Sequence, residues 1–170
     1  RDLTRHMTFL DYISHEEQDL DRWPWLTGDL WRTGGATMLP SRDRPVEEIA
    51  ARILAGPREH LYTRASALVG LIDHVAAGGR PVRLAGEIIT ASESLPSGLR
   101  ALAQTHLGAR VVDRYSCEEV GPIAFQCPRT ETHYHVASSN VLVEAVDDDG
   151  RETPAGKPGN PEKKAPAPAK

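Results

Sequence analysis

The chain has 170 residues, of which 39% are hydrophobic, 26% charged and 5% aromatic, and its formal net charge is -4. This composition is typical of a soluble globular protein, and it argues against a general cationic surface for nucleic acid or an anionic membrane. No apolar run in the sequence approaches the ~18 residues that cross a bilayer, so we expect a cytoplasmic protein without a nucleic-acid or membrane partner.

The first 41 residues have weak periodicity, and there the sequence predicts only a short helix near Glu16 to Asp21. Two amphipathic helices are then predicted over residues 45–55 and 65–77. Both place apolar side chains at helical spacing, and both are followed directly by glycine. The first also begins with proline, which is favoured in the first turn of a helix.

A third predicted helix takes Ser94 as its N-cap, runs from about Pro96 and stops at Gly108. Apolar runs rich in valine and isoleucine flank it, and they predict strands over residues 82–90 and 110–115. Strand, helix and strand with short connections form a βαβ unit, whose parallel strands belong to an α/β sheet.

Three shorter strands are predicted over residues 123–126, 134–137 and 141–146, with a turn at 147–150 after the last. We expect these strands to pair antiparallel. Residues 160–170 are rich in proline and lysine and contain no apolar residue larger than alanine, so we expect them to be disordered. The fold class is therefore α/β, with βαβ units on a parallel sheet followed by short antiparallel strands.

Ligands of α/β sheets bind beyond the carboxyl ends of the parallel strands, which directs attention to the loops after Thr90 and Tyr115. The first loop is small and polar, and the second carries two carboxylates and a Gly-Pro turn. An aromatic ring such as that of Tyr115 can stack on a base, and small residues admit a ligand near the backbone. A carboxylate can hold Mg²⁺ beside a phosphate. The alternative is structural: Ser92 and Ser94 as helix caps, Tyr115 in the core, and Glu118 with Glu119 as a solvated turn.

Four stretches have the order and approximate spacing of one known family: PREHLYTRAS at 57–66, ITASESL at 89–95, VVDRYSCEEVGPIAFQC at 111–127 and YHVASSNVLVE at 134–144. In these stretches the chain resembles the adenylate-forming enzymes, and within them the phenylacetate-CoA ligase-like branch that includes proteins annotated with capsular polysaccharide biosynthesis. The resemblance implies part of the large N-terminal domain of such an enzyme. Residues 42–159 would be the partial AMP-binding domain, after a poorly defined segment 1–41 and before the tail 160–170.

The resemblance implies a two-step reaction. A small-molecule carboxylate such as an aryl acid attacks ATP to give an acyl adenylate and pyrophosphate, and the thiol of coenzyme A then takes the acyl group. Glu119 matches the glutamate of the family's tyrosine-glycine-x-threonine-glutamate motif, which implies a catalytic residue that binds Mg²⁺. Gly121 and Pro122 would lie near the carboxylate substrate. The implied nucleotide-binding residues are Ala91, Ser92, Glu93, Asp113, Arg114, Tyr115 and Ser116.

The sequence also departs from the family pattern. Ser116 replaces the usual glycine, and Glu118 replaces a threonine or serine that donates a hydrogen bond toward phosphate, which an ionised carboxylate cannot do. The family's glycine-rich phosphate loop, hinge aspartate and C-terminal domain with its catalytic lysine are not found in these 170 residues. We therefore expect a fragment of the enzyme, interrupted near Gly159 and inactive as an isolated chain.

Two other functions stay open. Cys127, His133 and His135, with Cys117 or Glu131 as a further ligand, could form a structural zinc site, although their spacing matches no paired zinc-finger pattern. Otherwise the two cysteines are reduced thiols and the histidines lie on the surface. The chain could also be a non-catalytic module that binds a nucleotide or a partner protein without turnover.

Overall fold

The structure is a computed structural model, and it describes residues 7–10, 18–20, 36–39, 44–55, 60–79, 82–84, 86–117, 119–156 and 160–164. The chain forms two compact units, unit 1 (Arg1–Asp113) and unit 2 (Arg114–Lys170). Among the described segments, no helix combines the length and apolar character needed to cross a membrane.

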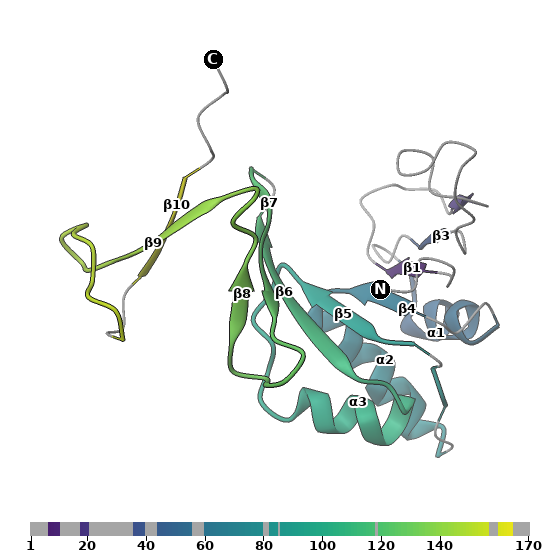
Figure 1. The fold of residues 1–170 in the computed structure, drawn as a ribbon. Coiled ribbons are helices and arrows are strands. Elements are labelled where there is room, and N and C mark those ends of the chain that lie inside the picture. The colour runs from purple at the N-terminus through teal and green to yellow at the C-terminus, as the bar shows by residue number, and fades with distance from the viewer. Residues whose placement is uncertain are drawn as a thin grey trace. The chain divides into compact units, whose positions relative to one another are not determined.

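Unit 1 is built on a mostly parallel sheet (Figure 1). The strand order is β2-β3-β1-β4-β5-β6, in which β3, β1, β4 and β5 are parallel neighbours and β2 runs antiparallel to β3. The strands of this sheet are β1 (Met7–Leu10), β2 (Gln18–Leu20), β3 (Ala36–Leu39), β4 (His60–Thr63), β5 (Ile88–Ala91) and the first three residues of β6 (Val111–Cys117).

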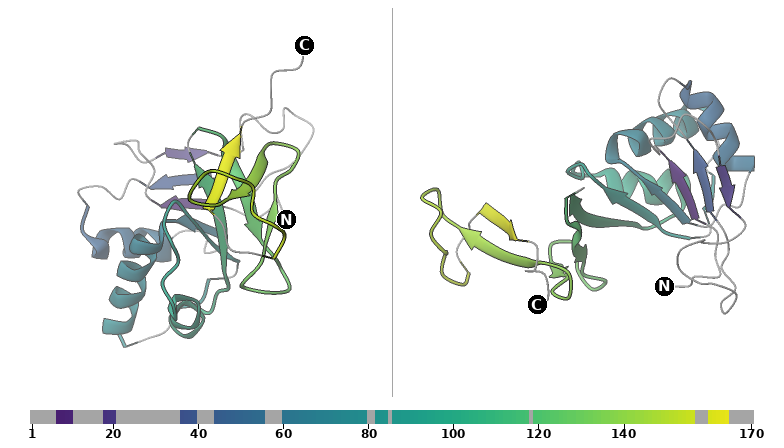
Figure 2. Two further views of the ribbon diagram at one scale, coloured as in Figure 1. Left: turned by 90° about the vertical axis from the view of Figure 1, so that its left-hand side faces the viewer. Right: turned by 90° about the horizontal axis from the view of Figure 1, so that it is seen from above.

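Three helices cover one face of this sheet, as the view from above in Figure 2 shows. They are α1 (Val46–Ala55), α2 (Ala65–Ala77) and α3 (Leu99–Leu107). Their apolar stripes pack on the strands to form the core, which supplies most of the free energy that favours folding. The largest side chains of this core are less than 2% exposed and come from both layers: Leu61, Leu68, Leu71, Ile88 and Leu107.

The predicted helices over 45–55 and 65–77 are confirmed. In α1, the Pro45 carbonyl accepts hydrogen bonds from the backbone N–H groups of Glu48 and Ile49, at 3.1 and 3.3 Å. In α2, every apolar residue on which the periodicity rested is buried, and Gly78 caps the C-terminus. Both helices could be predicted locally because their amphipathic repeat and their end signals agree.

The third helix begins later than predicted, because Gly98 and not Ser94 is its N-cap, with a φ of 83°. Its predicted end is correct, since Gly108 adopts the left-handed conformation and donates a hydrogen bond to the Gln104 carbonyl at 3.2 Å. The strand predicted over 82–90 is also too long. The backbone N–H groups of Val82 and Leu84 donate hydrogen bonds to carbonyls at the C-terminal end of α3. Residues 82–84 therefore lie against that helix and are not part of a strand.

The N-terminal prediction is wrong where it can be checked, because Gln18–Leu20 form β2 in place of the short helix near Glu16 to Asp21. Strands β1, β3 and β4 were not predicted. In β4, Leu61 and Thr63 are buried while His60 and Tyr62 are half-buried, so the strand carries the period-2 pattern over only four residues. Through β1 and β3, the segment 1–41, which has weak periodicity in the sequence, contributes strands to the sheet of unit 1.

Unit 2 is antiparallel, and the pairing predicted between the strands at 123–126 and 134–137 is confirmed, whereas the strand at 141–146 pairs with residues 160–164. The remainder of β6 pairs with β7 (Gly121–Gln126), and β7 pairs with β8 (Tyr134–Val136). The last predicted strand, β9 (Leu142–Val146), pairs with β10 (Asn160–Lys164) in a second, two-stranded sheet.

Strand β10 corrects the prediction that disorder begins at about Asn160. All five of its residues are in register with β9, from Asn160 opposite Val146 to Lys164 opposite Leu142. A ladder joins backbone groups, so a segment of poor apolar content can still pair with a strand. The predicted turn at 147–150 is confirmed: the Asp147 carbonyl accepts the Gly150 N–H at 3.0 Å. Residues 165–170 lie outside the described part of the chain.

Candidate functional site

The carboxyl ends of the unit 1 strands bring together side chains from three segments. Strands β4 and β5 are parallel, so Thr63 and Thr90 are register partners at the same edge of the sheet. Thr90 is fully buried, and its hydroxyl donates a hydrogen bond to Oδ1 of Asp113 on β6 at 2.9 Å. Asp113, a predicted nucleotide-binding residue, is therefore held by a buried donor at the strand ends.

The loop after β5 is held at both of its ends. Ala91 is 1% exposed, whereas Ser92 is exposed. Ser92 has a φ of 71°, and among the described residues other than glycine it is the one with a positive φ. The Glu93 carboxylate accepts two hydrogen bonds from Ser66, at 2.8 Å from the backbone N–H and at 2.9 Å from the hydroxyl. The same carboxylate lies 3.9 Å from Nε of Arg64.

These contacts place Glu93 at the N-terminus of α2. Arg64 is the N-cap residue of that helix and makes no side-chain capping hydrogen bond. The Ser66 N–H belongs to the first turn, where backbone donors have no partner within the helix. The carboxylate fulfils the role of a cap from a distant loop, and the positive end of the helix dipole favours its negative charge.

In unit 2, the β6–β7 hairpin carries the other predicted site residues. Tyr115 is 36% exposed and faces Ala124 in the register, while Ser116 faces Pro122, so a β-bulge leaves Ile123 as the extra residue. The bulge suits a proline, which cannot donate a ladder hydrogen bond. Gly121 follows the turn with a φ of 73°, a conformation that glycine adopts without a steric cost.

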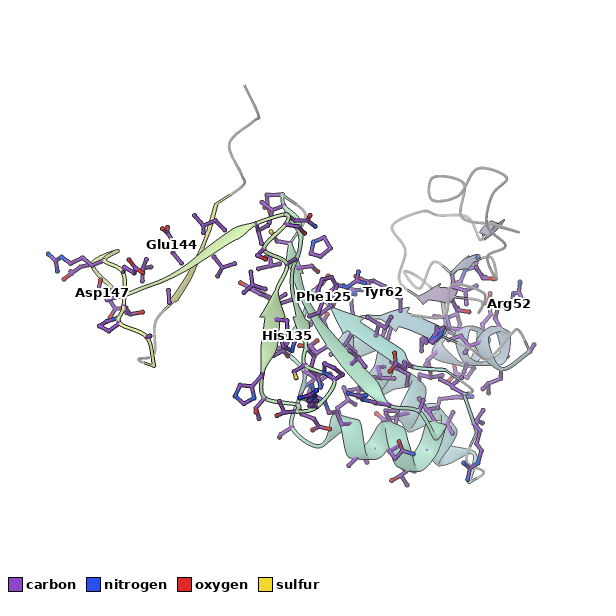
Figure 3. All side chains as sticks on the ribbon, in the orientation of Figure 1. Arg52, Tyr62, Phe125, His135, Glu144 and Asp147 are labelled. Carbon is purple, nitrogen blue, oxygen red and sulfur yellow. The ribbon has the colours of Figure 1, made fainter. Side chains whose placement is uncertain are left out.

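Arg114 and Glu119 differ in their surroundings. The Arg114 guanidinium carbon lies 5.3 Å from the centre of the Phe125 ring, which is within the range of a cation–π contact. Figure 3 labels Phe125 on β7. Glu119 is exposed in the turn between β6 and β7, and Glu118 lies outside the described residues.

The predicted nucleotide-binding residues thus fall into two groups. Ala91, Ser92, Glu93 and Asp113 belong to unit 1, and the others, together with Glu119, Gly121 and Pro122, belong to unit 2. Sequence reasoning assigned no site role to Thr90 or Ser66. Both lie within stretches that carry the family resemblance, but their partners are 23 and 27 residues away, so no local pattern could identify the contacts.

The zinc alternative depends on Cys127, His133 and His135. The backbone N–H of Cys127 donates to the His133 carbonyl at 2.7 Å, so these two residues face each other across the end of the β7–β8 ladder. Cys127 is buried, whereas the side chains of both histidines are exposed; His135 is labelled on β8 in Figure 3. Within the described ranges, no group of three or more His, Cys, Asp or Glu side chains is placed to share a metal ion.

No protein-family model matches the chain, and no curated protein sequence matches it significantly. Solved structures do match. The chain is similar to VinN, with a TM-score of 0.65 and 15% identity over 96% of this chain and 40% of that one. A benzoate CoA ligase from Burkholderia xenovorans LB400 gives a TM-score of 0.65 and 16% identity over 96% of this chain and 33% of its own.

A third structure, the anthranilate CoA ligase AuaEII in complex with anthranoyl-AMP, gives a TM-score of 0.56 and 19% identity over 79% of this chain and 27% of that one. The chain therefore spans between about a quarter and two fifths of the length of these three proteins. Its fold is a mixed α/β fold that matches part of the N-terminal domain of adenylate-forming enzymes.

Proposed function

We propose that this chain is part of an ATP-dependent carboxylate–CoA ligase of the phenylacetate-CoA ligase-like branch. The reaction joins a carboxylate to ATP to form an acyl adenylate and pyrophosphate, and coenzyme A then takes the acyl group as a thioester. The observation that carries the proposal is the match of the chain to structures of CoA ligases, one of which holds an acyl adenylate.

The arrangement at the carboxyl end of β5 supports this proposal. Thr90 is a fully buried donor whose hydroxyl orients the carboxylate of Asp113 on the strand β6. An oriented carboxylate beside the end of a strand can accept a hydrogen bond from a polar ligand such as a nucleotide. The exposed Ser92 backbone and the small Ala91 leave the adjacent loop without bulk.

The hairpin in unit 2 carries groups of its own that suit a nucleotide. Tyr115 is 36% exposed, and an aromatic ring is a group on which a base can stack. Glu119 is exposed in its turn, and a single accessible carboxylate suits Mg²⁺, which takes one or two protein oxygens and keeps the remaining positions for water and phosphate. When bound, Mg²⁺ would neutralise charge on the phosphates of ATP. Gly121 and Pro122, at the bulge, are proposed to lie beside the carboxylate substrate.

Carboxylate-dependent exchange of pyrophosphate into ATP tests the proposal. The natural polypeptide that contains this sequence should catalyse exchange with an aryl acid, and the 170-residue chain should bind ATP by calorimetry. We expect Glu119→Gln to abolish the exchange, because it removes the charge without changing the size of the side chain. The matched control is Glu152→Gln, an exposed carboxylate of unit 2 outside the proposed site.

The outcomes separate the candidate functions. Exchange that is lost in Glu119→Gln and kept in Glu152→Gln supports the ligase. ATP binding without exchange by the natural polypeptide overturns the ligase in favour of a non-catalytic nucleotide-binding module. Stoichiometric zinc in protein purified without added metal, with neither binding nor exchange, would favour the structural zinc domain.

A further inference from the structure

Glu93 makes a contact that its place in the sequence does not suggest. It follows β5 by two residues, yet its carboxylate lies at the start of α2, 27 residues earlier in the chain. One carboxylate oxygen accepts the Ser66 backbone N–H at 2.8 Å, and the other accepts the Ser66 hydroxyl at 2.9 Å. Both oxygens are thus engaged by the same residue of the helix.

Two groups with positive charge or partial positive charge lie beside the Glu93 carboxylate. The backbone N–H of Ser66 lies in the first turn of α2, where the helix dipole presents partial positive charge. The Arg64 guanidinium adds a second positive group at 3.9 Å, although both side chains of that ion pair are partly exposed and screened by solvent. Hydrogen bonds to a charged acceptor are stronger than those between neutral groups.

The contact closes a short loop between Ala91 and Glu93. Ala91 is fixed at the end of β5, where it is 1% exposed. Glu93 is fixed on α2, so the single residue between these two anchors, Ser92, has to span them. Ser92 does so with a φ of 71°, which residues other than glycine seldom adopt unless the surrounding structure imposes it.

We propose that Glu93 is a positioning residue, which fixes the backbone of Ser92 by anchoring the loop to the N-terminus of α2, and not a direct ligand of the nucleotide. This inference rests on the proposed function, in which the loop belongs to the nucleotide-binding residues. The element that Glu93 controls is the exposed left-handed Ser92, and the contact through which it acts is Ser66.

The test uses variants of both partners and two measurements. Calorimetry gives the Kd for AMP, and urea denaturation gives the unfolding midpoint without nucleotide. Glu93→Ala should raise the Kd roughly tenfold, which corresponds to a loss of about 1.4 kcal/mol of binding free energy. Ser66→Ala removes one of the two hydrogen bonds and should raise the Kd about threefold, and the double variant should bind no more weakly than Glu93→Ala alone. Glu93→Gln, which keeps an acceptor oxygen, should recover part of the affinity.

The control is Ser97→Ala, an exposed serine in the turn before α3, which should leave the Kd unchanged. A direct ligand role for Glu93 predicts that Ser66→Ala also leaves the Kd unchanged, and that result overturns the inference. So does a lower unfolding midpoint in Glu93→Ala with an unaltered Kd, because it would make the contact purely structural. If the unaltered chain and the natural polypeptide both fail to bind AMP and ATP, the proposed function fails first and the nucleotide part of the inference fails with it.

Discussion

The part-buried hydrogen bond between Thr90 and Asp113 allows the sharpest test of how the proposed site is built. Thr90→Val preserves the shape of the side chain and removes the hydroxyl that donates to Oδ1 of Asp113 at 2.9 Å. A hydrogen bond to a charged group contributes about 1.5–3 kcal/mol to stability, and because Asp113 is half-buried we expect a value near the lower limit, ~1.5 kcal/mol.

Thr63→Val is the matched control on the neighbouring strand. Thr63 is 1% exposed and Thr90 is fully buried, so the two positions are alike in burial. The Thr63 hydroxyl, however, donates at 3.3 Å to the backbone carbonyl of Arg64, the next residue. That contact is longer and its acceptor is neutral, so its loss should cost about 0.5 kcal/mol. The two variants therefore differ in the hydrogen bond that each removes, which is short and has a charged acceptor only at Thr90.

Urea denaturation followed by circular dichroism measures this difference. With an m value of about 2 kcal/mol per molar urea, Thr90→Val should lower the midpoint by ~0.75 M and Thr63→Val by ~0.25 M. Equal midpoints for the two variants would refute the reasoning, because they would mean that the bond to Asp113 adds no stability beyond that of an ordinary buried hydroxyl.

Three further predictions concern single positions. Ser92→Gly should raise the unfolding free energy by ~0.5 kcal/mol, measured by urea denaturation, since relief of the left-handed conformation outweighs the added entropy of the unfolded chain; a decrease would contradict this. Gly108→Ala should lower the unfolding free energy by about 1–2 kcal/mol in the same assay, because alanine is strained at a φ of 60° and its Cβ would lie 3.3 Å from Cγ of Arg83. An unchanged midpoint would argue against the role of Gly108 as the C-cap of α3. Phe125→Leu should lower the unfolding free energy by about 0.5–1 kcal/mol through loss of the ring beneath Arg114, and the loss should vanish in an Arg114→Ala background.

Sequence reasoning succeeded where the signal was local. The helices over 45–55 and 65–77 were predictable because burial of one face imposes a 3.6-residue repeat, and glycine marks the end of each. The stop at Gly108 and the turn after β9 were predictable for a similar reason, since each is defined by the conformation of a few consecutive residues.

The strands were harder because their partners are distant in the chain. The four residues of β4 are too few to establish a repeat, and they form a strand because β1 and β5 pair with them on either side. Likewise β10 has little apolar content, and its pairing with β9 could not be inferred from its own composition. Pairing energy of this kind depends on tertiary context more than on propensity.

The candidate site divides in the same way. The sequence by itself determined which residue types follow β5 and β6, and hence where an adenine nucleotide and a carboxylate substrate were to be sought. Only the tertiary structure decided what those residues touch: it placed the Thr90 hydroxyl on Asp113 and turned the Glu93 carboxylate onto Ser66. The physical reason is that hydrogen bonds across 23 and 27 residues depend on how a sheet and a helix pack, which no local pattern encodes.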